Sequence, residues 1–206
     1  VVVLAAGVVF FVAQGRSARR LARTLSDMLY VDGATGLPTR AALERELQKH
    51  TGGGFEPTVV MGVQILRCRQ LEGALGHAAF AKLEVAAADR LRQSFENAKA
   101  YRLSAGLFGI IAPSREMEVC EVLMAVILRA FDSPVEVENS RIDVSVAAGL
   151  TQDEDSDQAI RHLNLAIDAA RHEAARMAVY NADAHADPTA SLTLMSEMLQ
   201  GMDDGD

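Results

Sequence analysis

The chain alternates between segments with helical and with extended hydrophobic patterns. Apolar residues at helical spacing predict a long helix over residues 78–97, with Phe80, Leu83, Ala87 and Leu91 on its buried face. Similar spacing predicts four further helical segments, which are 40–50, a single turn at 72–76, 115–131 and a stretch from the acidic loop at 152–157 to about 175.

Short β-branched or apolar runs between these helices predict strands. They cover residues 58–66, 135–137, 142–148 and 177–180. Two further apolar arms flank the small-residue centre Ser104-Ala105-Gly106, which predicts a β-hairpin over 101–112. Helices and strands therefore alternate around one sheet of about five strands, which indicates an α/β fold.

The first residues of the chain are different in character, because residues 1–13 are apolar apart from one glycine. As a helix they would span about 20 Å, which is less than the roughly 30 Å of a hydrocarbon core. We interpret 1–15 as the C-terminal part of a transmembrane helix. An arginine cluster follows this segment, which is typical of the cytoplasmic side of a membrane helix. A cleaved signal peptide is the alternative, and it fits less well because the charges follow the apolar run. The cluster consists of Arg16, Arg19, Arg20 and Arg23.

Residues 16–31 continue as a connector helix whose stripe of Leu21, Leu25 and Met28 could pair with a second copy or pack on the domain. The formal net charge of the 206-residue chain is −8, which argues against a nucleic-acid partner. Cys68 and Cys120 lie in apolar sequence and are expected to be reduced thiols. The histidines have no metal-ligand spacing, so no metal site and no cofactor are expected.

Three motifs resemble the GGDEF family, whose active members are diguanylate cyclases. They are the segment Asp32–Arg40, the pair Gly76-His77 and the hairpin at 101–112, in the family's order and spacing. The resemblance covers about 26–180 and implies a domain over 32–181. It implies a palm-like fold similar to nucleotide cyclases, with a mostly antiparallel central sheet flanked by helices.

The family motif at the hairpin centre is Gly-Gly-Asp/Glu-Glu-Phe, and this chain departs from it. The corresponding residues are Ser104, Ala105, Gly106, Leu107 and Phe108. The family takes metal-binding carboxylates from the hairpin and from the end of the first strand, where this chain has Gln64 and Leu66. Joining two GTP molecules requires divalent cations held by carboxylates. The resemblance therefore implies that the metal site is lost at Gln64 and Gly106 and that no catalytic residue remains.

Nucleotide recognition has also changed at the family's positions. Glu72 replaces an asparagine, Ala81 replaces the aspartate that binds guanine, and Phe80 is expected to obstruct the base. Arg69 and Arg171 keep the basic character of phosphate-contacting lysines, although both also suit an ordinary charged surface. The family's product-inhibition site aligns with Phe95 and Ala98, which carry no charge.

The family's structural motif is better preserved. Its matching residues are Asp32, Thr35, Gly36, Leu37, Pro38 and Arg40. We expect Asp32 to pair with Arg40 across the loop and Thr39 to cap the following helix. Residues 182–206 contain a polar linker and an amphipathic stretch at 191–200, and they resemble the opening of an EAL phosphodiesterase domain.

The favoured hypothesis is a catalytically inactive GGDEF domain in cyclic di-GMP signalling. It would act as a regulatory or dimerisation relay in a homodimer, anchored in the inner membrane with the domain facing the cytoplasm. An EAL domain would follow in cis, and the fragment itself would not be an enzyme. One alternative is an active cyclase, whose carboxylates would have to come from elsewhere than the distant cluster at 153–157. Another is an allosteric module that binds GTP through Arg69, Glu72 and Arg171.

Overall fold

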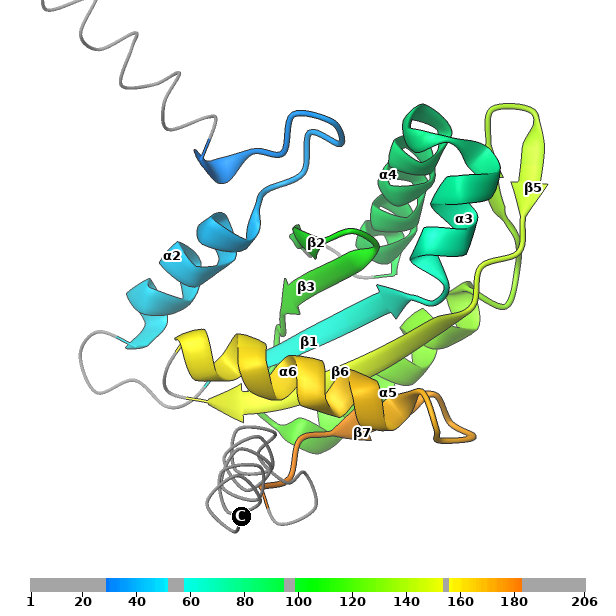
Figure 1. The fold of residues 1–206 in the computed structure, drawn as a ribbon. Helices are drawn as coiled ribbons and strands as arrows, with labels where there is room; N and C mark the ends of the chain where they lie inside the picture. The colour runs from blue at the N-terminus through cyan, green and yellow to red at the C-terminus, as the bar shows by residue number, and fades with distance from the viewer. Residues whose placement is uncertain (1–28, 52–57, 95–98, 154–155, 183–206) are drawn as a thin grey trace, which may run out of the picture.

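The computed structural model describes residues 29–51, 58–94, 99–153 and 156–182, and it contains helices packed around a central sheet (Figure 1). The strands are β1 (Thr58–Ile65), β2 (Ala100–Ser104), β3 (Leu107–Ile111), β4 (Val135–Val137), β5 (Ser140–Ile142), β6 (Val146–Asp153) and β7 (Met177–Val179). The helices are α2 (Arg40–Thr51), α3 (Cys68–Leu75), α4 (His77–Gln93), α5 (Met117–Ala130) and α6 (Ser156–Ala170).

The central sheet has five strands in the order β2-β3-β1-β6-β7. Its neighbours pair antiparallel except β6 and β7, which are parallel. The predicted mostly antiparallel sheet and the predicted hairpin are therefore confirmed. In the hairpin, Tyr101 lies opposite Gly109 and Ser104 opposite Leu107.

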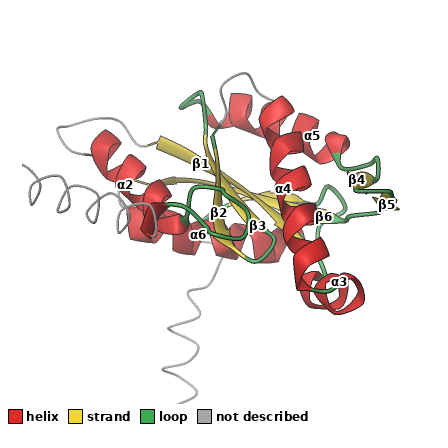
Figure 2. Ribbon diagram, turned by 90° about the horizontal axis from the view of Figure 1, so that it is seen from above, coloured by secondary structure: helices red, strands yellow, loops and turns green. Residues whose placement is uncertain are grey.

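The two faces of the sheet bury different helices, because successive side chains of a strand point to opposite sides. Val59, Met61 and Val63 of β1 belong to a core cluster with the apolar faces of α4 and α5. Val60 belongs to a second cluster with α2 and α6. Both views place helices on the two sides of the sheet (Figures 1 and 2), and Figure 1 shows α6 crossing in front of β6.

Two opposed glycines allow α6 to approach the sheet closely. Gly62 of β1 lies opposite Gly149 of β6. A Cβ added at Gly62 would lie 2.8 Å from Cδ2 of Leu163, and one at Gly149 would lie 2.9 Å from the backbone nitrogen of Ile167. Larger residues at these positions would push the helix away and open the core between them.

Some predicted boundaries are wrong. The strand expected over 142–148 is two elements, because Ile142 pairs with Val135 in a separate two-stranded ribbon and β6 starts only at Val146. The last helix ends at Ala170 instead of about 175, and Arg176 beyond it has a left-handed φ of 54°. The predicted helical turn at 72–76 is the end of the longer helix α3.

No helix among the described residues is long and apolar enough to cross a membrane. The predicted membrane segment at 1–15 and almost all of the connector at 16–31 lie outside the described residues, as does the tail from 183 onward.

Candidate functional site

The tip of the hairpin packs against the end of β1 and the start of α3. Gly106 adopts a left-handed φ of 65° that favours glycine. Its carbonyl oxygen accepts a hydrogen bond of 2.8 Å from the backbone nitrogen of Ile65. A Cβ at Gly106 would lie 2.3 Å from Sγ of Cys68 and 3.2 Å from Cβ of Ile65. The turn therefore closes on Cys68 and leaves no room there for a larger side chain.

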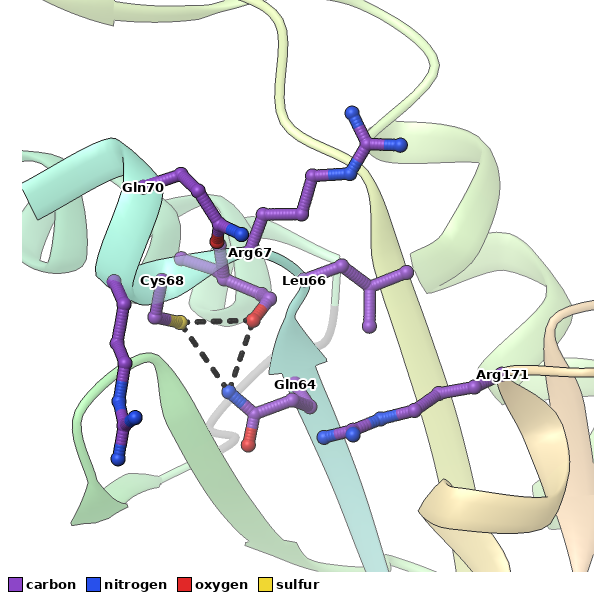
Figure 3. A pocket seen from close by; sticks show the side chains of 8 residues that line it. Gln64, Leu66, Arg67, Cys68, Gln70 and Arg171 are labelled. Atoms are coloured by element: carbon purple, nitrogen blue, oxygen red, sulfur yellow. Dashed lines mark hydrogen bonds between the residues drawn. The ribbon is translucent and has the colours of Figure 1, made fainter. Parts of the chain in front are cut away.

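A cavity of about 620 Å³ opens beside this contact, at the C-terminal end of β1 (Figure 3). The residues that line it come from the end of β1, the start of α3 and the turn after α6. They are Gln64, Ile65, Leu66, Arg67, Cys68, Arg69, Gln70 and Arg171. The structure therefore brings together Gln64, Arg69 and Arg171, which the sequence singled out separately.

The lining of this cavity carries positive charge. It contains Arg67, Arg69 and Arg171 and includes no carboxylate. The amide nitrogen of Gln64 donates to the carbonyl oxygen of Ile65 at 2.9 Å, so this side chain is held by the backbone. Divalent cations bind oxygen ligands that usually include carboxylates, and guanidinium groups repel them. These residues do not fit the metal ions of a cyclase, whereas they suit an anion such as a phosphate.

Cys68 is expected to be an unreactive thiol in this site. Its Sγ donates to the carbonyl oxygen of Ile65 at 2.8 Å and lies 3.4 Å from the amide nitrogen of Gln64. Burial is the main cause that raises the pKa of the Cys68 thiol above its ordinary value. The thiolate, which is the nucleophilic form, is therefore disfavoured near neutral pH.

The sequence analysis missed Glu84, which is only 2% exposed. It lies on α4 between Phe80 and Leu91, and its carboxylate contacts the hairpin tip. Its Oε1 accepts a hydrogen bond of 2.6 Å from the backbone nitrogen of Gly106. Arg102 of β2 donates from Nε to Oε1 and from Nη2 to Oε2, both at 3.1 Å. The signal in the sequence was an acidic residue on the apolar stripe of a helix.

Asp32 begins the loop that the sequence predicts, but its ion-pair partner differs from the one expected. Its Oδ2 lies 3.3 Å from Nη1 of Arg102, whereas Arg40 pairs with Glu44 one turn along α2, at 2.6 Å. The expected Asp32–Arg40 pair is therefore wrong. Arg40 points outward from an exposed helix start, while Arg102 reaches the loop from the edge strand of the sheet. Residues 70 positions apart meet here.

Thr35 stabilises the ionised form of Asp32. The Thr35 hydroxyl donates to Oδ1 of Asp32 at 2.6 Å, and the Thr35 backbone nitrogen donates to the same oxygen at 2.9 Å. Burial alone would raise the pKa of Asp32. The bonds from Thr35, together with the charge of Arg102, outweigh burial and lower this pKa below its ordinary value.

The end of the loop attaches to the edge of the sheet. The backbone nitrogen of Arg102 donates to the carbonyl oxygen of Pro38 at 2.7 Å. The Thr39 hydroxyl donates to the carbonyl oxygen of Leu29 at 2.7 Å, so it binds the preceding segment instead of capping α2 as expected.

The residues expected at the guanine pocket are not gathered around the cavity. Phe80 is 2% exposed in the core beneath α4 and does not line the cavity, and its expected obstruction of the base stays a prediction. Glu72 pairs with His77 on the surface, at 3.0 Å between Oε1 and Nδ1, and does not line the cavity. Phe95 and Ala98, expected at the former product-inhibition site, lie outside the described residues.

Comparison with known proteins identifies similar chains. A family model described as diguanylate cyclase, GGDEF domain, matches residues 29–177. The cyclic di-GMP phosphodiesterase PA2567 of Pseudomonas aeruginosa is 27% identical over 187 residues, which are 87% of this chain and 32% of that protein. The chain therefore spans about a third of the length of this curated relative.

Solved structures share the fold. The crystal structure of the GGDEF domain of PA2567 is 27% identical with a TM-score of 0.57, over 69% of this chain and 91% of that one. The S helix-GGDEF-EAL structure of Vibrio cholerae LapD, bound to c-di-GMP, gives a TM-score of 0.70 at 18% identity. It covers 90% of this chain and 46% of that one.

Proposed function

Because the chain belongs to the GGDEF family, we propose that it is a regulatory member without cyclase activity, acting in cyclic di-GMP signalling. In this proposal the domain transmits the state of the N-terminal connector to a phosphodiesterase domain that follows it. The protein is a homodimer in the inner membrane, with this domain in the cytoplasm.

The observation that carries the proposal is the cavity at the end of β1. Two GTP molecules bring triphosphate charge that metal ions must neutralise during phosphoryl transfer. The lining offers three arginines and the amides of Gln64 and Gln70, but no carboxylate. The nearby carboxylate of Glu84 is bound to Arg102 and to the backbone of Gly106. Among the described residues, this lining would leave metal-dependent GTP condensation without a carboxylate ligand, which supports the proposal.

The phosphodiesterase part of the proposal is supported by the relative from Pseudomonas aeruginosa. That protein is named a cyclic di-GMP phosphodiesterase, and this chain matches about a third of it. The amphipathic stretch at 191–200 and its resemblance to the opening of an EAL domain support the same arrangement.

A second candidate function is binding of GTP without turnover. The favouring observation is that Arg67, Arg69 and Arg171 line one cavity. Arginine forms bidentate hydrogen bonds with phosphate oxygens and does not need a metal to do so. Calorimetric titration with GTP, with and without magnesium, distinguishes this candidate. Binding that Arg69→Ala and Arg171→Ala abolish would favour it over a purely structural domain.

The test of the first proposal is a turnover assay on the purified protein. With GTP and either magnesium or manganese, we expect no cyclic di-GMP above the enzyme-free background. An active diguanylate cyclase assayed in parallel shows that the conditions support the reaction. Metal-dependent product that increases with protein concentration would overturn the proposal of a silent domain.

A further inference from the structure

A buried carboxylate lies on the core-facing side of α4, where the other side chains are apolar. Glu84 is 2% exposed, among Phe80, Leu83 and Ala87. An ionised carboxylate is costly to bury unless charged and hydrogen-bonding partners compensate it. The identity of its partners therefore tells what the residue holds in place.

Both partners belong to the hairpin, one on its first strand and one at its tip. Arg102 on β2 binds both oxygens of Glu84 through Nε and Nη2, at 3.1 Å each. This fork is the strong geometry for an arginine and a carboxylate. The backbone nitrogen of Gly106 donates to Oε1 of Glu84 at 2.6 Å. Glu84 thus holds the tip of the hairpin from the helix side.

The opposite side of the tip closes on the cavity. Sγ of Cys68 occupies the space where a Cβ at Gly106 would stand, 2.3 Å away. The backbone hydrogen bond between Ile65 and Gly106 fixes the same contact. A tip released from Glu84 would move away from Cys68 and widen the cavity that contains it.

Arg102 connects this arrangement to the loop that follows the connector. Nη1 of Arg102 lies 3.3 Å from Oδ2 of Asp32, and both side chains are 22% exposed. Thr35 holds the other oxygen of Asp32. The same guanidinium therefore contacts the loop at Asp32 and the buried carboxylate at Glu84.

We infer that Glu84 and Arg102 form a latch that couples the position of the Asp32–Arg40 loop to closure of the hairpin tip over Cys68. When the loop moves, Asp32 leaves Arg102, the fork on Glu84 loosens, and the tip opens. This inference rests on the proposed function, because the loop is where a signal from the connector would arrive. The latch gives that signal a defined path to the hairpin tip.

Thiol labelling of Cys68 in the full chain tests the latch, with a maleimide as the probe and peptide mass spectrometry as the readout. Cys120, which is buried in the core, is an internal control for general loosening. We expect Asp32→Asn to raise the labelling rate of Cys68 about fivefold and to leave Cys120 unchanged, as a local opening would. Arg40→Gln breaks an exposed pair beside the same loop and is the matched control, with no expected change.

The Asp32→Asn arm is the decisive one. Besides burial, the charge of Glu84 helps to raise the pKa of Cys68, so Glu84→Gln would favour the thiolate directly. Glu84→Gln is therefore used only with Asp32→Asn, in a double-mutant cycle in which a latch gives a non-additive effect. Unchanged Cys68 labelling in a folded Asp32→Asn protein would overturn the inference, as would equal acceleration at both cysteines. Neither readout involves GTP or phosphodiesterase activity, so failure of the latch and failure of the proposed function are distinguishable.

Discussion

Gly106 shows how one residue determines what the hairpin tip can do. Its left-handed φ and its contact with Cys68 both require the absence of a side chain. The position that the resemblance aligns with a carboxylate of active family members is therefore a packed structural position in this chain.

Restoring a carboxylate at this tip should destabilise the domain. Gly106→Asp places a Cβ 2.3 Å from Sγ of Cys68 and holds a non-glycine residue at a φ of 65°. We expect the free energy of unfolding to fall by about 1–3 kcal/mol, measured by chemical denaturation. Gly73→Asp in α3 is the matched control, because a Cβ there meets nothing within 4 Å. An unchanged stability of Gly106→Asp would show that the tip is looser than its geometry indicates.

Tyr101 predicts a dependence of stability on alkaline pH. Burial, assisted by the charge of Glu46, raises the pKa of Tyr101 from 10.0 to about 12. The folded state then keeps a proton that the unfolded chain loses, so stability is full below about pH 10 and is lost as the pH rises towards 12. Tyr101→Phe should abolish this part of the decline in pH-dependent unfolding experiments. A parallel decline in both proteins would contradict it.

At the scale of elements, α5 has two apolar faces, of which one is buried in the core and the other is exposed to solvent. Met124 is fully buried, whereas Val119, Val122 and Val126 are 39%, 66% and 48% exposed. The apolar spacing of the sequence does not distinguish these two faces, because both consist of hydrophobic residues.

Two substitutions on α5 should therefore have very different effects. Met124→Ala leaves a cavity in the core and should lower the free energy of unfolding by about 2–5 kcal/mol. Val122 lies on the exposed side of the same helix, so Val122→Ala should change the free energy of unfolding by no more than about 0.5 kcal/mol. Thermal or chemical denaturation of the pair checks this, and similar losses in both variants would place α5 differently on the sheet.

The sequence predicts local elements well and long-range pairing poorly. The buried stripe of α4 and the hairpin at 101–112 follow from spacing and turn residues, and the structure confirms both. The contact between Asp32 and Arg102 joins residues 70 positions apart, so proximity in sequence pointed to Arg40 instead. Similarly, the apolar run at 142–148 does not reveal that its first residue pairs with β4 outside the main sheet.

The candidate site follows the same rule. The resemblance to the family located Gln64, Arg69 and Arg171, which the fold brings to one cavity. Glu84 departs from an apolar stripe, but only the hairpin's position shows what it binds. Phe80 lies on the buried face of α4, as the helical spacing predicts.

At the scale of the whole molecule, a contiguous set of contacts runs from the loop after the connector to the hairpin tip. Asp32 contacts Arg102, Arg102 binds Glu84, and Glu84 holds Gly106 against Cys68. In the proposed function, a domain without cyclase metal ligands that keeps this set of contacts is suited to transmitting a conformational change. Under that proposal the structure serves coupling, and the contacts are its physical path.

The most direct test of this account compares connector and cavity variants of the full-length protein in membranes, with hydrolysis of cyclic di-GMP as the readout. Leu25→Asp and Met28→Asp alter the connector stripe, and Arg69→Ala and Arg171→Ala alter the cavity. The account predicts that the connector variants change the hydrolysis rate about fivefold or more, as is typical of allosteric coupling, while the cavity variants stay near the wild-type rate. If the cavity variants change the rate and the connector variants do not, the domain acts through a bound anion and the account is contradicted.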